Sequence, residues 1–318
     1  MAAIHVLVDG GAALPSGAAA SYDLTQVAHH IQVGATRFHA GTTEPADLNA
    51  ALADPRMAVL PAETVELVEG YAAVAAMGVA LLSLHAPTGL GGLGDRAGAA
   101  ALRAGLPASR LAIRILPLLG PGLGMVALHA AEVAQEAMPL DDLAEAIAGL
   151  AAAMRSETVA MDPQRLRAKA AERGWTVIES VAETVDAAVT GAGEERSEAT
   201  GAAKPEGRGP FADPDAEGPL CFRFETADDG STRLVIVDRC PDLNTAMRQL
   251  AGRILADGRD KTVHLAAAST GAEAEVAALA TFLDAQLGLA EAWLAPADPL
   301  TAWLCGAGSF TVAWYVEG

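Results

Sequence analysis

Lysine is the scarcest charged residue of this chain of 318 residues, since it occurs only as Lys169, Lys204 and Lys261. Lysine and arginine together number 21 against 40 aspartates and glutamates, which gives a formal net charge of −19 at pH 7. Because affinity for nucleic acids depends on cationic side chains that neutralise phosphates, nucleic acids are excluded as partners. The same charge disfavours docking on an anionic membrane surface.

Cysteine is also rare, and Cys221, Cys240 and Cys305 are too few and too scattered for a disulfide framework. No two of them have the spacing of metal ligands, so we expect buried, reduced thiols. The seven histidines include the adjacent His29 and His30, but no HExxH or similar pattern with carboxylates occurs. The sequence therefore predicts neither a metal site nor a cofactor.

Long apolar runs and aromatic residues are lacking as well. Aromatic residues make up 4% of the chain although 52% is apolar, which indicates an interior of alanine, leucine and valine. The longest uncharged run, residues 70–94, is broken by glycines, a histidine and a proline, whereas a spanning helix needs about 20 predominantly apolar residues. We expect no stable membrane insertion. No basic residue precedes Arg37, unlike a secretory signal, so a cytoplasmic location is predicted.

The most informative segment that is present is residues 79–101, VALLSLHAPTGLGGLGDRAGAAA. It predicts a buried strand, a glycine-rich turn from Gly89 to Gly94 and an alanine-rich helix. Such a turn brings backbone N–H groups and the positive end of a helix dipole to one place, where an anion binds. The alternative is that the glycines only permit a tight turn and close packing.

The glycine spacing also fits the dinucleotide-binding fingerprint. That fingerprint needs an acidic residue about 20 positions further along the chain. The next predicted strand, residues 111–116, runs into Pro117 with no carboxylate. We therefore do not expect NAD binding.

Strands and helices alternate in the first half, which favours a parallel sheet with helices on both faces. Strands are predicted at residues 4–8, 28–33, 56–60 and 111–116, and helices at 44–52, 62–77, 124–137 and 141–154. We assign residues 1–154 to an N-terminal α/β domain and residues 155–318 to a C-terminal α+β domain.

The second half mixes both kinds of element. Strands are predicted at 175–179, 262–268, 290–294 and 310–316, a hairpin at 220–225 and 232–238, and helices at 244–256 and 272–287. Residues 190–218 are polar, rich in glycine and proline and without periodicity. This composition predicts a disordered insertion.

Five short segments carry a resemblance to a known family: residues 8–15 (VDGGAALP), 38–41 (FHAG), 58–62 (AVLPA), 87–93 (PTGLGGL) and 304–308 (LCGAG). Their order resembles that of the DegV family of fatty-acid-binding proteins. The family motifs in these places are an Asp-Ser-Thr-like turn before Asp/Glu-Leu-Pro, Tyr-x-Asp-Gly, Thr-Ser-Gln-Pro-Ser, Ser-Ser-x-Leu-Ser-Gly-Thr and His-x-Gly-Pro-Gly. The Gly-Leu-Gly at 122–124 fits a further family element, and the resemblance covers most of the chain apart from about 155–219.

The resemblance implies a two-domain protein that holds a long-chain fatty acid in an apolar tunnel, with the carboxylate at the domain interface. It also implies that the protein presents the acid to a separate kinase and catalyses nothing itself. By position in the motifs, the implied ligand-binding residues are Val59, Thr88, Gly91, Gly92, Leu304, Gly306 and Gly308.

The chain departs from the family at polar positions. Val59 and Gly91 stand where the family has serines, and Leu304 stands where it has histidine. Each change removes a hydrogen bond to a charged group, typically worth about 1.5–3 kcal/mol. Two interpretations follow, and they differ in whether a carboxylate is still held.

In the first interpretation, backbone amides around Gly91, Gly92 and Gly94, with Thr88 and His85, hold the carboxylate. The tail then supplies affinity at about 0.8 kcal/mol per buried CH₂. In the second, the head-group pocket has closed or takes a neutral lipid, and the protein is a divergent scaffold that binds partners. We favour the first, because glycine in place of serine keeps the backbone approach open.

Single residues with catalytic potential lack the companions that catalysis needs. Asp9 ends the first strand, where a carboxylate holds a ligand hydroxyl or caps a helix. Cys305 has no evident base, and no G-x-S-x-G motif precedes Ser309. A kinase of a related fold would need clustered aspartates and a phosphate-binding loop, which are absent from the sequence. The sequence therefore predicts a binding protein and not an enzyme.

Overall fold

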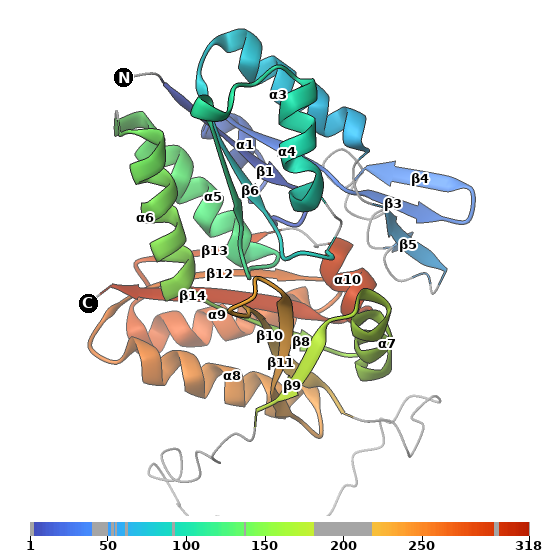
Figure 1. Cartoon of the computed structure of the whole chain (residues 1–318). Coiled ribbons are helices and arrows are strands. Elements are labelled where there is room, and N and C mark those ends of the chain that lie inside the picture. The colour runs from blue at the N-terminus through green and yellow to red at the C-terminus, as the bar shows by residue number, and fades with distance from the viewer. Residues whose placement is uncertain are drawn as a thin grey trace, which may run out of the picture.

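The computed structural model describes residues 3–39, 50–51, 54, 56–60, 63–90, 93–136, 138–180, 218–295 and 299–317. Three of the predictions lie outside these residues: the insertion at 190–218 except for its last residue, most of the helix at 44–52, and the ligand-binding candidates Gly91 and Gly92. The described chain forms two large sheets that face each other across a layer of helices (Figure 1).

The N-terminal sheet is parallel and has the strand order β2-β1-β6-β7. Its strands are β1 (Ile4–Asp9), β2 (Leu24–Val27), β6 (Ala80–His85) and β7 (Leu111–Ile115). The chain adds β2 on one side of β1 and then β6 on the other. The direction of winding therefore reverses between β1 and β6.

Helices cover both faces of this sheet, as predicted (Figure 1). One face carries α3 (Thr64–Met77) and α4 (Leu93–Arg103), and the other carries α5 (Pro121–Val133) and α6 (Leu140–Ala153). Leu67, Tyr71 and Val74 form the buried stripe of α3, at the spacing of one helix face. Short helical turns occur at α1 (Ala18–Ser21), η1 (Ala108–Arg110) and η2 (Ala134–Glu136).

A small antiparallel sheet lies beside the N-terminal sheet. It has the order β4-β3-β5 and consists of β3 (His30–Val33), β4 (Thr36–His39) and β5 (Met57–Leu60). The extended segment predicted at 28–33 is therefore shorter than expected, because residues 28 and 29 form the connection between β2 and β3.

The C-terminal sheet is mixed and has the order β13-β12-β14-β8-β10-β11-β9. Its strands are β8 (Arg155–Ala160), β9 (Thr176–Glu179), β10 (Leu220–Thr226), β11 (Thr232–Arg239), β12 (Thr262–Ser269), β13 (Glu291–Ala295) and β14 (Phe310–Glu317). The predicted hairpin is confirmed as the antiparallel pair β10 and β11. The last strand, β14, lies in the middle of the sheet between β12 and β8.

Four helices accompany this sheet: α7 (Pro163–Arg173), α8 (Leu243–Gly258), α9 (Glu273–Leu287) and α10 (Pro299–Cys305). Helices α8 and α9 cover the outer face, and α5 contacts β12 and β14 from the inner side. Because α5 lies between the two sheets, most of its residues are buried. Its first residue is Pro121, three residues earlier than predicted, which suits the preference of proline for the first helical turn.

The largest apolar cluster joins the two sheets. It contains Val8 and Leu84 from the N-terminal sheet, Leu123 from α5, and Phe222 and Ala313 from the C-terminal sheet. The apolar interior therefore continues from one half of the chain into the other. The domain boundary at residue 154 stays a prediction.

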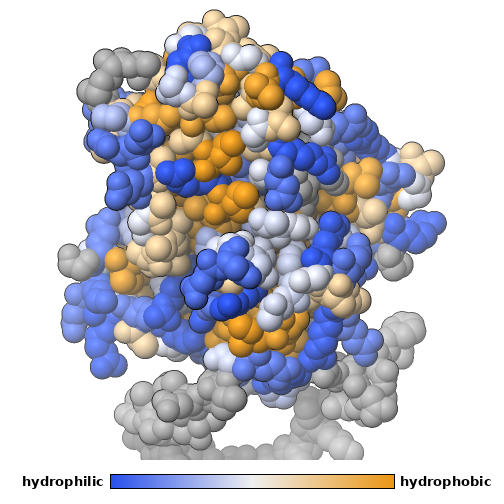
Figure 2. All heavy atoms as spheres, viewed as in Figure 1, coloured by the Kyte–Doolittle hydropathy of each residue, from blue (hydrophilic) through white to orange (hydrophobic). Residues whose placement is uncertain are grey.

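Hydrophilic and hydrophobic residues are both exposed on the surface. On the face shown in Figure 2, hydrophobic residues form separate areas between hydrophilic ones. Within the described parts of the chain, no helix combines the length and apolar character that crossing a membrane requires.

Candidate functional site

The candidate site is the edge of the N-terminal sheet where the winding reverses. In open parallel sheets, ligands bind outside the carboxyl ends of the strands at such a reversal point. Here this point lies between β1, which ends at Asp9, and β6, which ends at His85. A Cβ added to Gly11 would lie 3.2 Å from Leu300 Cδ1, so α10 of the C-terminal half covers this edge.

Asp9 joins the loops that follow β1 and β6. Its two carboxylate oxygens accept hydrogen bonds from the N–H groups of Gly11 (2.8 Å) and Ala86 (2.9 Å). Its Oδ2 lies 3.4 Å from Nδ1 of His85, and both side chains are buried. Burial raises the pKa of Asp9, but His85, the charge of His29 and the Ala86 N–H together lower the pKa below its ordinary value. Asp9 is therefore ionised at neutral pH and holds loops instead of capping a helix.

A buried chain of hydrogen bonds orients His85. Its Nε2 lies 2.8 Å from Ser83 Oγ, which in turn lies 2.7 Å from the hydroxyl of Tyr71 on α3. Ser83 and His85 are two residues apart on one strand and so point to the same face. The order Asp, His, Ser is that of a nucleophilic triad. Ser83 is fully buried and bonded to Tyr71, however, so this arrangement orients the imidazole.

His29 lies against the same edge, in the connection between β2 and β3. A Cβ added to Gly10, the residue after Asp9, would lie 2.9 Å from His29 Cδ2. His29 is 0% exposed, and neither of its ring nitrogens has a hydrogen-bond partner. Burial lowers the pKa of His29 below its ordinary value, although the charge of Asp9 opposes this shift. We call Asp9, His29 and His85 the carboxyl-edge cluster.

The neighbouring His30 serves a different purpose. Its Nε2 lies 2.8 Å from Glu66 Oε1 on α3. The two adjacent histidines thus point in different directions, as expected of neighbours on an extended chain. In the described part of the chain, no group of three or more His, Cys, Asp or Glu side chains is suited to hold a metal ion.

Two of the residues predicted in the N-terminal half, Val59 and Thr88, lie on different elements. Val59 is buried in β5, opposite Ile31 of β3. The side chain of Thr88 is exposed, but its carbonyl accepts hydrogen bonds from Trp175 Nε1 and Thr232 Oγ1, both at 3.1 Å. Thr88 therefore links the loop after β6 to the C-terminal half through its main chain and not through its hydroxyl.

The three residues predicted in the C-terminal half lie on α10 or just after it. Leu304 is fully buried on α10, which contacts β5, so the elements that carry Leu304 and Val59 meet. Gly306 and Gly308 follow with φ of 84° and 80°, in the region that favours glycine. Their N–H groups donate to the carbonyls of Ala302 (2.9 Å) and Thr270 (2.7 Å). These two amides are therefore already used.

The other candidate nucleophiles have structural roles. Ser309 Oγ donates to the carbonyl of Cys305 (2.8 Å) and accepts from the N–H of Met161 (3.0 Å). All three cysteines are buried thiols, as predicted. Sequence reasoning considered Asp9 and His85 one at a time and treated His29 only as a possible metal ligand. The signal for the cluster was that Asp9 and His85 each directly end a predicted buried strand.

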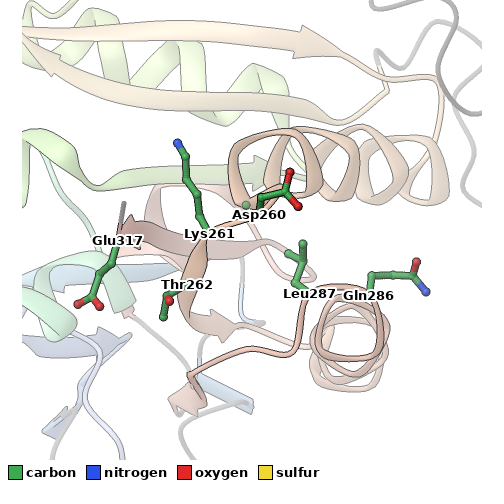
Figure 3. Close-up of a pocket in the computed structure, with 7 residues that line it drawn as sticks. Asp260, Lys261, Thr262, Gln286, Leu287 and Glu317 are labelled. Carbon is green, nitrogen blue, oxygen red and sulfur yellow. The ribbon is translucent and has the colours of Figure 1, made fainter.

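A hollow of about 590 Å³ lies far from this edge, where β12 begins and β14 ends (Figure 3). It is lined by Gly258, Asp260, Lys261, Thr262, Gln286, Leu287 and Glu317. In Figure 3 the side chains of Lys261, Gln286 and Glu317 point in different directions. Because no polar groups converge there, this hollow does not form a binding site of the kind seen at the carboxyl edge.

The structure is similar over its whole length to solved structures of DegV proteins. A DegV lipid-binding protein from Thermotoga maritima has a TM-score of 0.72 at 13% identity, with 98% of each chain covered. A DegV family protein from Thermus thermophilus, described by its fatty-acid binding, has 0.71 at 16%, with 100% of each chain covered. One from Eubacterium eligens loaded with heptadecanoic acid has 0.65 at 12%, covering 99% of this chain and 100% of that one.

At these identities the similarity shows the fold. The chain has the DegV fold, as the short motifs predicted. No protein-family model matches the sequence, and no curated protein matches it.

Proposed function

We propose that this chain is a divergent DegV family protein that binds a long-chain fatty acid between its two sheets and catalyses no reaction. The observation that carries the proposal is the apolar cluster shared by both sheets, which ends at a buried polar edge where the strand winding reverses. The shared fold supports it, because two of the similar proteins named above are described by a bound or binding fatty acid.

The tail dominates the expected affinity. At about 0.8 kcal/mol per buried CH₂, a sixteen-carbon tail contributes on the order of 10 kcal/mol, whereas a hydrogen bond to a charged head group contributes about 1.5–3 kcal/mol. Val59 and Leu304 leave the neighbourhood of the head group more apolar than in the family. We infer that the protein retains long-chain ligands although several head-group donors are missing.

The proposal includes a partner. By analogy with the family, the protein presents its fatty acid to a separate kinase in the cytoplasm. The second candidate function is a scaffold of the same fold without fatty acid, and the occupied amides of Gly306 and Gly308 favour it.

Native mass spectrometry of the purified protein, followed by solvent extraction and lipid analysis, tests the proposal. We expect a mass above that of the bare chain, or uptake of palmitate or oleate by delipidated protein. A mass equal to that of the polypeptide alone, with no uptake of either acid, would contradict the proposal and favour the scaffold function. Incubation with ATP and palmitate should yield no acyl phosphate, and formation of that product would show an enzyme instead.

Restoring a hydroxyl at the head-group position gives a sharper test. In Val59→Thr the side chain keeps its shape and gains a donor, so we expect palmitate to bind about tenfold more tightly, equivalent to about 1.4 kcal/mol. The matched control is Val276→Thr, on α9 in a different apolar cluster, which is also buried and should leave the dissociation constant unchanged. Titration calorimetry on delipidated protein measures both. Equal constants in both variants would place the head group elsewhere.

A further inference from the structure

His29 is a buried side chain for whose ring nitrogens the described residues supply no hydrogen-bond partner. A buried polar group without a hydrogen bond destabilises the fold, so native proteins nearly always provide such groups with a partner. Both ring nitrogens of His29 are buried and unpartnered, whereas His30 next to it has Glu66. The ring also lies against Gly10, at the reversal point where ligands bind in sheets of this kind.

The other donors at this edge are largely occupied. Asp9 takes the N–H groups of Gly11 and Ala86, and the N–H of Leu90 bonds to the carbonyl of Pro87. The amides of Gly306 and Gly308 bond to carbonyls of their own half. Among the described residues at the edge, His29 is the buried side chain that has no hydrogen bond on either ring nitrogen, whereas His85 has Ser83 on one nitrogen and Asp9 at 3.4 Å from the other.

The negative charge of Asp9 determines which protonation state of His29 favours the binding of an anion. Asp9 is a buried anion, and among the described ion pairs its only partner is the imidazole of His85, at 3.4 Å. A second carboxylate brought into the same low-dielectric region would be repelled. A cation between the two anions removes this repulsion. The imidazole of His29 is a group next to Asp9 that can become such a cation near neutral pH.

We propose that His29 binds the head group of the fatty acid and takes up one proton as it does so, which places an imidazolium between the ligand carboxylate and Asp9. This inference rests on the proposed function. The bond formed is a hydrogen bond from His29 to a carboxylate oxygen, and the proton comes from solvent. Apart from this N–H bond, which forms as hydronium or buffer gives up the proton, no covalent bond changes.

The pH dependence follows from the groups that face His29. These are Asp9 on β1, which has His85 of β6 at 3.4 Å, and the adjacent His30, which contacts Glu66 of α3. Burial holds the pKa of His29 low in the free protein, and a bound carboxylate raises it. Affinity is therefore greatest at low pH and falls as pH rises through the pKa of the complex. Between the two pKa values it falls by up to about tenfold per pH unit, because one proton is bound.

Titration calorimetry in buffers of different ionisation enthalpy counts the protons taken up on binding. The probes are palmitate, hexadecanesulfonate, which stays ionised throughout, and hexadecanol, which is neutral. The variants of the delipidated full chain are His29→Gln and the control His129→Gln, since His129 is a half-exposed histidine on α5. We expect uptake of up to one proton with both anions in the wild type and the control, and none with hexadecanol.

In His29→Gln we expect no proton uptake with the sulfonate and an affinity for it at least tenfold lower at pH 6. Unchanged uptake in this variant would overturn the role of His29 while the proposed function stands. If the wild type binds neither palmitate nor hexadecanesulfonate, both the role of His29 and the proposed function are overturned. If His29→Gln does not fold, the imidazole ¹³C resonances of the wild type decide: the His29 signal must move toward the protonated position on addition of the sulfonate, and a fixed signal overturns the inference.

Discussion

Asp9 shows how one side chain determines what its surroundings can bind. Its carboxylate accepts main-chain N–H groups from two loops, and these are groups that could otherwise surround a bound anion. The start of the loop after β6, at Ala86, is thus adjacent to an anion that belongs to the protein. An external carboxylate needs a different kind of partner, which is why an imidazole matters more here than further backbone amides.

Replacing glycine by alanine should have opposite effects on the free energy of unfolding at Gly89 and at Gly98. A Cβ on Gly89 would lie 2.8 Å from Trp175 Nε1, and its φ of 88° strains any other residue. We expect Gly89→Ala to lower the free energy of unfolding by about 1–3 kcal/mol. Gly98 lies within α4 with open space around it, so Gly98→Ala should raise the same quantity by about 0.5–1 kcal/mol. Urea unfolding followed by tryptophan fluorescence measures both. Equal effects would contradict the packing of Gly89 on Trp175.

The identity of single site residues was only partly predictable. The sequence places Asp9 and His85 at the ends of strands, but their contact depends on β1 and β6 being neighbours in the right register. That pairing joins residues 76 positions apart, and no local pattern encodes it. His29 could not be recognised for the same reason, since its contact with Gly10 joins two separate loops.

At the scale of elements, the N-terminus of α8 depends on Asp242. Its carboxylate accepts a hydrogen bond from the N–H of Thr245 at 2.7 Å. Hydrogen bonds from the backbone and the side chain of Thr245 lower the pKa of Asp242 below its ordinary value. The folded pKa lies below the unfolded one, so the stabilisation is present above the unfolded pKa, about 3.9, and is lost as pH falls through the folded value. We expect Asp242→Ala to be less stable than the wild type at pH 7, with a difference that shrinks on acidification below about pH 4.

Asp242→Asn separates capping from charge. An asparagine caps nearly as well as an aspartate, so this variant should keep most of the stability at pH 7. It should lack the part of the acid dependence that Asp242 supplies. Thermal unfolding across pH 2.5 to 7 measures all three proteins, and identical acid profiles for wild type and Asp242→Asn would show that the carboxylate does not titrate with folding.

Most elements could be predicted because their apolar residues repeat with the period of a helix or a strand. Three of the elements that were not predicted have physical reasons. Helix α7 buries only Pro163, Leu166 and Ala170, so its apolar stripe is weak in the sequence. Helix α10 is short and buried on all sides, which removes any periodicity. Strand β8 follows α6 almost without a break, and its polar start conceals a buried end.

At the scale of the molecule, the shared apolar cluster couples the two halves. We expect one cooperative unfolding transition and not two, because separating the sheets exposes the interior of both. Two substitutions test this. Tyr71→Phe removes a buried hydroxyl in the N-terminal half, at about 1 kcal/mol, and Leu283→Ala empties a buried position on α9 in the C-terminal half, at about 2–5 kcal/mol.

Scanning calorimetry should show both variants lowering the midpoint of the same single transition. Two transitions, each sensitive to one of the variants, would instead show halves that unfold independently. That outcome would also support the proposed boundary at residue 154.

The central position of β14 has a consequence for how the molecule is assembled. A ribosome makes this strand after every other strand of its sheet, yet β12 and β8 pair only through it. Until Phe310 to Glu317 have been synthesised, the two flanks of the sheet exist as separate ribbons with unpaired inner edges. Such edges invite pairing with other chains. The nascent polypeptide is thus prone to aggregation until β14 is inserted between β12 and β8. We expect chaperones to contribute most to correct folding in that interval.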